Sequence, residues 1–216
     1  IGSSSPEEQR LFDLYDQFHE WFVPALLNVL EVWRQEGCNL IFSLNAPNSK
    51  KGCESLIKYI KKSIMQNQLF IFEGRLFCVE LNESLLNEEA EFVEYFLGEL
   101  ELMNIATSLD QFSRCETKLV NLVNRKFDHM KVRRCDFNHE SDDEYEKILR
   151  ISSFLRISLG CDLVAVGIEN IQNFKRVKAA GGDNVQGYFL GRPLTANDSW
   201  TAFISQYSLL EELIDK

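Results

Sequence analysis

The 216-residue sequence lacks the features of several large classes of protein. It has no apolar run near the roughly 20 residues that a membrane-spanning helix needs. Its six cysteines form no CxxC pair and no short cluster with histidine, which argues against a zinc site or a disulfide framework. Basic residues are in the minority, 23 against 33 acidic ones, and a net charge of -10 argues against general binding of nucleic acid or anionic membranes. We therefore expect a cytoplasmic protein, or the cytoplasmic part of a larger one.

The sequence does contain enough apolar material for one domain. Hydrophobic residues make up 45% and aromatic residues 12% of the chain, which a single core of this size can bury. Residues 1–6 begin Ile-Gly-Ser-Ser-Ser, a composition typical of a linker or of an end cut from a longer chain. Residues 7–216 are predicted to form the domain.

Helical and strand patterns alternate along this domain. Apolar residues at three-to-four spacing predict helices over 7–33, 50–65, 84–103, 116–124, 142–157, 171–179 and 195–213. Short apolar runs predict strands over 38–46, 75–81, 104–109, 129–132, 162–166 and 184–186. Short strands alternating with helices are typical of an α/β fold with a parallel sheet, either doubly wound or closed toward a barrel.

Polar residues at the strand ends favour the barrel. Asn45, Glu80, Asp110 and Gln186 each stand at or near the carboxyl end of a different strand, and Lys131 lies within another. In a (β/α) barrel these ends meet at one mouth, whereas a doubly wound sheet gathers function at one switch point. An amide and two carboxylates are ligands that Mg²⁺ or Mn²⁺ accepts. Taken singly, however, each residue is better explained as a turn, surface or helix-capping residue.

Six short motifs follow one another in an order that resembles a known family. They read FSLN, VELNE, LDQF, MKV, AVGIE and VQGYFLGRPL. From about residue 7 to the end, the order resembles the EAL domain family, the cyclic di-GMP phosphodiesterases of bacterial signalling. The resemblance implies a modified TIM-like (β/α) barrel, of whose usual eight strands this sequence contains six. We expect preceding residues, or another chain, to supply the first two strands and the Glu-Ala-Leu triplet that the second carries.

The resemblance also implies roles for single residues, because the family holds two divalent metals that activate water against a phosphodiester bond. Three residues match the family's metal ligands: Asn45, Glu80 and Asp110. Lys131 matches the lysine that orients the water, and Gln186 matches a glutamine in the same mouth. Glu169 matches the second acid of its motif, and Glu83 matches a glutamate that steadies a neighbouring loop.

Departures from the family pattern predict loss of hydrolysis. One metal-binding aspartate is Gln111, another aspartate is Arg133, and the catalytic glutamate is Val166, which can neither accept a proton nor bind a cation. Relative to the family pattern the local charge changes by about four units, so we expect no bound metal pair and no cofactor. Mg²⁺ or Mn²⁺ would be needed only if activity survives. We further expect Arg133 to pair with Asp110 or Glu80 in place of the metal, or else to lie on the surface.

The expected function is a catalytically inactive, regulatory or protein-interaction domain in cyclic di-GMP signalling. The alternatives are a receptor that binds cyclic di-GMP without hydrolysing it and, third, an active phosphodiesterase. The residues expected to meet a ligand are Asn45, Asp110, Lys131, Arg133, Gln186 and Arg192. The expected partners are other signalling proteins or domains and a second copy of the chain. Phe92, Tyr95 and Phe96 would form a dimer face if exposed, although core packing explains them better.

Overall fold

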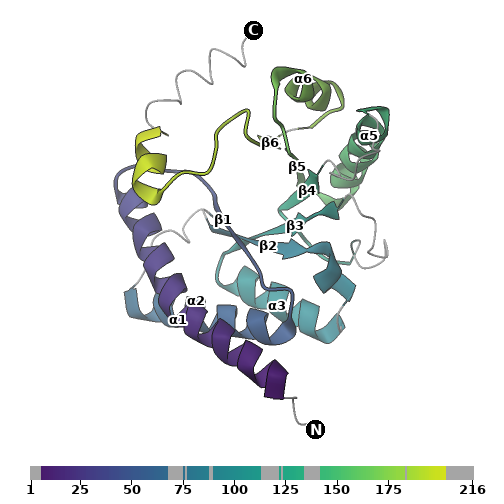
Figure 1. Ribbon diagram of the computed structural model, residues 1–216. Coiled ribbons are helices and arrows are strands. Elements are labelled where there is room, and N and C mark those ends of the chain that lie inside the picture. The colour runs from purple at the N-terminus through teal and green to yellow at the C-terminus, as the bar shows by residue number, and fades with distance from the viewer. Residues whose placement is uncertain are drawn as a thin grey trace.

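Six parallel strands form one curved sheet with helices on its outer side (Figure 1). The structure is a computed structural model that describes residues 6–67, 75, 77–87, 90–112, 122, 124–133, 142–182 and 184–202. The strands are β1 (Phe42–Asn45), β2 (Phe77–Asn82), β3 (Ala106–Asp110), β4 (His129–Arg133), β5 (Asp162–Val166) and β6 (Asn184–Gln186). They are neighbours in chain order, as in a barrel, with no reversal of the kind found in a doubly wound sheet. The predicted TIM-like α/β fold is confirmed.

Helices connect the strands. They are α1 (Pro6–Gln35), α2 (Lys50–Asn67), α3 (Ala90–Leu102), α5 (Asp142–Leu159) and α6 (Ile171–Ala179). A 3₁₀ helix, η2 (Glu83–Asn87), follows β2, and residues 196–202 are helical. Within the described part of the chain, no helix is both long enough and apolar enough to cross a membrane.

Two predicted boundaries differ from the structure by more than two residues. The strand expected from residue 38 begins at Phe42, because the ladder with β2 starts where Phe42 pairs with Phe77. The helix expected from residue 84 is a 3₁₀ helix there, and α3 begins at Ala90. Most of the helix expected over 116–124, and the end of the helix expected over 195–213, lie outside the described residues.

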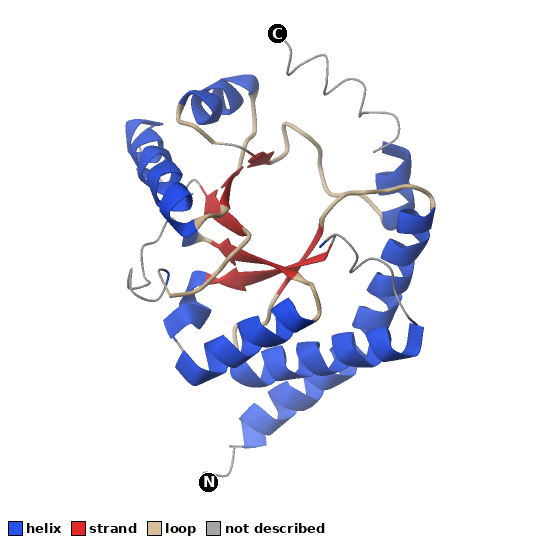
Figure 2. Cartoon of the chain, turned by 180° about the vertical axis from the view of Figure 1, so that it is seen from behind, coloured by secondary structure: helices blue, strands red, loops and turns tan. Residues whose placement is uncertain are grey.

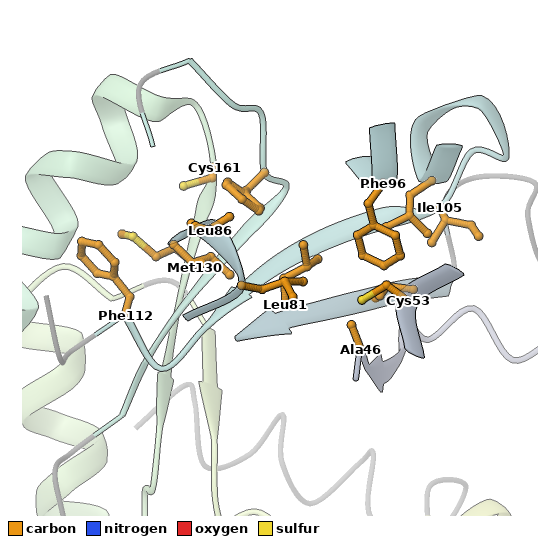
Figure 3. Packing of buried hydrophobic residues seen from close by; sticks show 14 of the residues in the cluster. Ala46, Cys53, Leu81, Leu86, Phe96, Ile105, Phe112, Met130 and Cys161 are labelled. Atoms are coloured by element: carbon orange, nitrogen blue, oxygen red, sulfur yellow. The ribbon is translucent and has the colours of Figure 1, made fainter. Parts of the chain in front are cut away.

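The hydrophobic core fills the layer between the outer face of the sheet and the helices. Phe77, Val79 and Leu81 of β2 are buried there in one cluster with Phe96 and Ile105 (Figure 3). Removing apolar side chains from water stabilises the fold by roughly 25 cal/mol per Å². The outer face of β2 thus anchors the strand whose inner face carries the site.

The inner face of the sheet is polar. Successive side chains of a strand point to opposite faces, so Glu80 points away from the core that holds Val79 and Leu81. Asp110 and Lys131 follow core residues in the same way on β3 and β4. All three charged side chains therefore point to the inside of the curved sheet.

Helix α3 buries two of the aromatic residues considered as a dimer face. Phe92 and Phe96 are almost inaccessible and stack with ring centroids 6.1 Å apart. Tyr95, between them in the sequence, is exposed. Core packing, the preferred explanation, is confirmed for Phe92 and Phe96, which belong to the core cluster and cannot form a dimer face.

The sheet stays open between its two outer strands. In the described part of the chain, β1 and β6 each pair with a single neighbour. After β6 the chain crosses to the carboxyl end of α1 (Figure 2). There Trp200 stacks on Trp33 with ring centroids 6.0 Å apart. Residues 187–202 thus link the two edges of the open sheet.

Candidate functional site

Lys131 forms the centre of a buried polar group at the carboxyl ends of the strands. Its Nζ donates to Oε1 of Glu80 at 2.5 Å and to Oε1 of Gln186 at 3.0 Å. Glu80 and Lys131 are both 8% exposed. Because the pair is shielded from water, its attraction is stronger than that of a surface ion pair. One lysine on β4 thereby connects β2 with β6 across the inside of the sheet.

The other residues that match family ligands lie on neighbouring strands. Asn45 is in register with Glu80, and Asp110 is in register with Asn82. Asp110 is buried at the end of β3, whereas Asn45 is exposed on the edge strand β1. Glu83 is buried in η2, directly after β2. The structure therefore gathers the predicted carboxylates at the mouth but leaves Asn45 at its rim.

Arg133 and Val166 stand side by side where β4 and β5 end. The register pairs them directly, and Val166 in turn pairs with Gln186. Val166 is buried and Arg133 is exposed. The expectation that Arg133 pairs with Asp110 or Glu80 is wrong: among the described residues no ion pair joins Arg133 to either carboxylate, and Glu80 instead accepts from Lys131. The alternative, that Arg133 lies on the surface, is the one observed. Arg133 ends its strand two residues beyond Lys131 and so lies one layer nearer the solvent.

The backbone of Gln111 adopts a conformation that residues other than glycine rarely take. Its φ is 61°, in the left-handed region, directly after β3. Asparagine and aspartate tolerate this region better than longer side chains. The half-buried amide therefore occupies a turn whose backbone suits the aspartate implied by the resemblance.

A cavity of about 440 Å³ opens beside the polar group around Lys131. Its lining consists of Arg133, Val166, Gly167, Glu169, Asn173, Gln186, Gly187 and Tyr188. The volume lies within the range of small-molecule sites, and a cation, a carboxylate, two amides and an aromatic ring share its wall. The predicted residues Arg133, Glu169 and Gln186 therefore come together in one cavity.

Two side chains in this lining, those of Tyr188 and Asn173, were not predicted. Tyr188 is exposed, and the guanidinium carbon of Arg192 lies 5.0 Å from the centre of its ring, a cation–π contact. Arg192 is thus placed on Tyr188 at the rim. Asn173 lies in the first turn of α6, where its backbone N–H donates to Oδ1 of the capping residue Asn170. Tyr188 could have been predicted from its position directly after Gln186 and Gly187. No feature of the local sequence indicates that Asn173 lines the cavity.

Gly187 sets the position of Gln186 through a close approach of two backbones. A Cβ at Gly187 would lie 2.1 Å from the carbonyl oxygen of Ile168. The backbone N–H groups of Gly167 and Ile168 both donate to the carbonyl oxygen of Gln186. Only a residue without a side chain fits there, so glycine allows the strand end to bring Gln186 within reach of Lys131.

The residues at the mouth do not fit a pair of divalent metals. Glu80 already accepts from an ammonium group, and Val166 offers no ligand oxygen. Within the described ranges, no three His, Cys, Asp or Glu side chains come together in a way that could hold a metal ion. Arg133 adds positive charge at the same edge, where a metal would require negative charge.

Sequence comparisons connect the chain with signalling proteins of bacteria. The chain is 22% identical to the signaling protein YkoW of Bacillus subtilis, over 81% of this chain and 22% of YkoW. It is 25% identical to the cyclic di-GMP phosphodiesterase PdeB of Shewanella oneidensis, over 76% of this chain and 18% of PdeB. The chain thus spans about a fifth of the length of these relatives, 22% and 18%.

Solved structures share the fold. A MucR phosphodiesterase in complex with cyclic di-GMP aligns with a TM-score of 0.75 and 21% identity, over 90% of this chain and 84% of that one. The EAL domain of FimX aligns with a TM-score of 0.71 and 13% identity, over 89% and 78%. The profile of the EAL domain matches residues 7–193. Because this match covers most of its length, the chain belongs to the EAL domain family.

Proposed function

We propose that this EAL domain acts in cyclic di-GMP signalling without hydrolysing the dinucleotide, as a regulatory domain that contacts other proteins or domains. The observation that carries the proposal is the pairing of Arg133 with Val166 in the β4–β5 register. A cation and an aliphatic side chain stand there side by side, at two positions that are acidic in the family pattern.

The chemistry of the mouth supports this proposal. Metal-assisted hydrolysis needs anionic oxygens that hold the cation, and the bound cation in turn lowers the pKa of its water. Lys131 offsets the charge of Glu80, Gln111 is neutral, and Val166 can accept no proton. The remaining groups can bind and orient an anion, but among the described residues that line the cavity the exposed Glu169 is the only carboxylate.

The cavity favours a second candidate, a receptor that binds cyclic di-GMP and leaves it intact. A guanidinium such as that of Arg133 suits a phosphate, and an exposed ring such as that of Tyr188 suits a nucleobase. Both line the cavity of about 440 Å³. The aligned MucR structure contains cyclic di-GMP, which makes this ligand the first to test.

We also propose where the domain acts and what it contacts. We place it in the cytoplasm, either alone or as part of a larger protein. Its partners are other signalling proteins, neighbouring domains and a second copy of the chain. General nucleic-acid binding is disfavoured by the net charge of -10.

Two measurements test the proposal. The chain is incubated at micromolar concentration with cyclic di-GMP and either Mg²⁺ or Mn²⁺, beside an active EAL phosphodiesterase as positive control. We expect no linear dinucleotide product from this chain, and measurable turnover would contradict the proposal. Calorimetry with cyclic di-GMP then separates the two candidates: heat that is lost in Arg133→Ala supports the receptor, and no heat supports the protein-interaction domain.

A further inference from the structure

A second cavity lies at the amino ends of the strands, opposite the mouth. Its volume is about 330 Å³, and its lining consists of Ile41, Arg75, Ala106, Asp128, His129, Gly160 and Asp162. His129 and Asp162 are the first residues of β4 and β5. Arg133 and Val166, which line the cavity at the mouth, are the last residues of the same strands. A site in the second cavity therefore does not depend on the function proposed for the first.

Two polar atoms in this second cavity lie close together without a hydrogen bond. The register pairs His129 with Asp162, so both side chains lie on the same face of the sheet. Nδ1 of His129 is 4.0 Å from Oδ2 of Asp162, which is too long for a hydrogen bond. Nδ1 is buried and has no hydrogen-bond partner in the part of the chain that the structure describes. The gap leaves room for one donor that both atoms share.

The spacing of the two atoms suits a primary ammonium group. A nitrogen about 2.9 Å from each of them has the two acceptors at an angle of roughly 90°, near the tetrahedral angle between two N–H bonds. An ammonium group has three such donors and no acceptor. When the imidazole of His129 carries its proton on Nε2, Nδ1 accepts one N–H. The carboxylate of Asp162 accepts another.

The charge of the cavity wall also favours a cation. Two carboxylates, those of Asp128 and Asp162, line the cavity beside one cation, Arg75. The guanidinium of Arg75 is held by Asp128 at 2.8 Å and by Glu101 at 3.1 Å, so its charge is offset within the protein. The side chain of Asp162 is 59% exposed, so a ligand that enters from solvent can reach its carboxylate.

The lining suits an organic cation better than a metal ion. Among the described residues, no three His, Cys, Asp or Glu side chains are placed to hold a metal. Apolar side chains share the wall: Ala106 is buried, and Ile41, directly before β1, is 50% exposed. A ligand with an alkyl chain would remove the side chain of Ile41 from water. The volume of about 330 Å³ lies at the lower end of the range of small-molecule sites.

We propose that this cavity binds a small aliphatic primary amine. The ammonium group lies between His129 and Asp162, and the alkyl chain lies against Ile41 and Ala106. Short alkylamines and diamines belong to this class. A lysine side chain of another protein carries the same group on an alkyl chain, and the experiment separates these two sources.

An NMR titration of the ¹⁵N-labelled chain with n-pentylamine tests the site. It is done in about 150 mM salt, which screens the general attraction of a cation to an acidic chain. We expect saturable shifts at Ala106, His129 and Asp162, with a dissociation constant near the millimolar range for so small a ligand. Pentyltrimethylammonium has the same charge and chain but no N–H donor, so it should bind at least about ten-fold more weakly. Nα-acetyl-lysine methylamide is the lysine probe and should bind more weakly than n-pentylamine.

Two variants test the residues on either side of the ammonium group. Asp162→Asn should weaken the binding of n-pentylamine by about ten-fold or more, because it removes a charged acceptor. His129→Phe should also weaken it, because phenylalanine keeps the ring and lacks the acceptor nitrogen. Glu94→Gln on α3 is the matched control, since it removes the same charge from an exposed residue outside the cavity lining. It should bind n-pentylamine like the wild type, and circular dichroism checks the fold of each variant.

Four results would overturn the proposal. One is the lack of saturable shifts at the cavity with n-pentylamine up to about 10 mM. Another is pentyltrimethylammonium binding as tightly as n-pentylamine, which would mean that the N–H donors are not recognised. The third is an equal loss of binding in Asp162→Asn and Glu94→Gln, which would mean general attraction to the acidic chain. The fourth is tighter binding of Nα-acetyl-lysine methylamide, which would assign the cavity to a protein side chain instead of a free amine.

Discussion

Lys131 on β4 holds Glu80 on β2 with its Nζ 2.5 Å from Oε1, although β3 lies between the two strands. On β3, Ser108 is in register with Glu80 and is fully buried. A small side chain at this place leaves room for the lysine to cross to the carboxylate. The ion pair therefore crosses the inside of the curved sheet and joins two strands that are not neighbours.

The first prediction concerns the stability of this pair. Lys131→Met should lower the free energy of unfolding by about 3 kcal/mol, because it leaves a buried carboxylate without its cation. The double variant Glu80→Gln/Lys131→Met should lose less than the sum of the two single variants. Urea unfolding of the four proteins measures this coupling. Additive losses would mean that the two groups do not interact in the folded protein.

The second prediction concerns Gly187. Gly187→Ala should destabilise the fold by about 2 kcal/mol or more, since its Cβ would collide with the backbone of Ile168, which cannot swing aside. Gly191→Ala is the matched control, because a Cβ there meets nothing within 4 Å. It should be neutral or slightly stabilising. Thermal unfolding midpoints of both variants measure this difference in stability. Equal midpoints would show that the close approach at Gly187 does not require glycine.

The third prediction concerns pH. Burial lowers the pKa of His19 below its ordinary value of 6.5, against the opposing attraction of Asp16. At pH values between the lowered pKa and 6.5, His19 is therefore protonated in the unfolded chain and neutral in the folded chain. Stability should be full above about pH 6.5 and should fall as the pH drops through this window. Urea unfolding between pH 5 and 8 measures the fall.

His19→Gln isolates this contribution. The Oγ of Ser55 donates its single proton to Asp16, so the Nδ1–H of His19 donates to that oxygen, at 3.0 Å. Glutamine offers an N–H donor without titrating, so the variant should lose part of the pH dependence between 5 and 6.5. The other histidines remain in both proteins and cancel in the difference. Identical slopes in wild type and variant would count against a neutral His19 in the fold.

The fourth prediction concerns metal binding at the mouth. The triple variant Gln111→Asp/Arg133→Asp/Val166→Glu should bind Mn²⁺ in calorimetry, because it restores three carboxylates where the wild type has none. Val166→Glu alone should bind much more weakly, since Arg133 remains as its neighbour in the register. Wild-type protein that bound Mn²⁺ as tightly as the triple variant would contradict the proposed loss of the metal site.

The sequence predicted the sheet better than it predicted the connections. The order of motifs predicted the barrel-like order of strands, and the range predicted for β5, 162–166, is the observed one. The start of β1 could not be predicted, because Leu40 and Ile41 are as apolar as the strand itself. Their place depends on where β2 begins to pair with Phe42.

The site divides in the same way. Lys131, Glu80 and Gln186 could each be named from the sequence, but their mutual contacts could not. Of the two alternatives for Arg133, the ion pair with Asp110 or Glu80 was wrong and the surface position was right. The sequence could not decide between them, because strand alternation tells which face a residue occupies and not how far from the solvent it lies. Asn173 was missed because it reaches the cavity only through the position of α6.

The sequence by itself determined the strands, the helices and the polar side chains at the strand ends, because alternation along a strand and periodicity along a helix are local properties. The tertiary structure decided which cation meets which carboxylate, why Gly187 must lack a side chain, and which strand ends border the second cavity. These outcomes depend on contacts between segments far apart in the chain, such as the one between Glu80 and Lys131, which are 51 positions apart. Local periodicity carries no information about such distances.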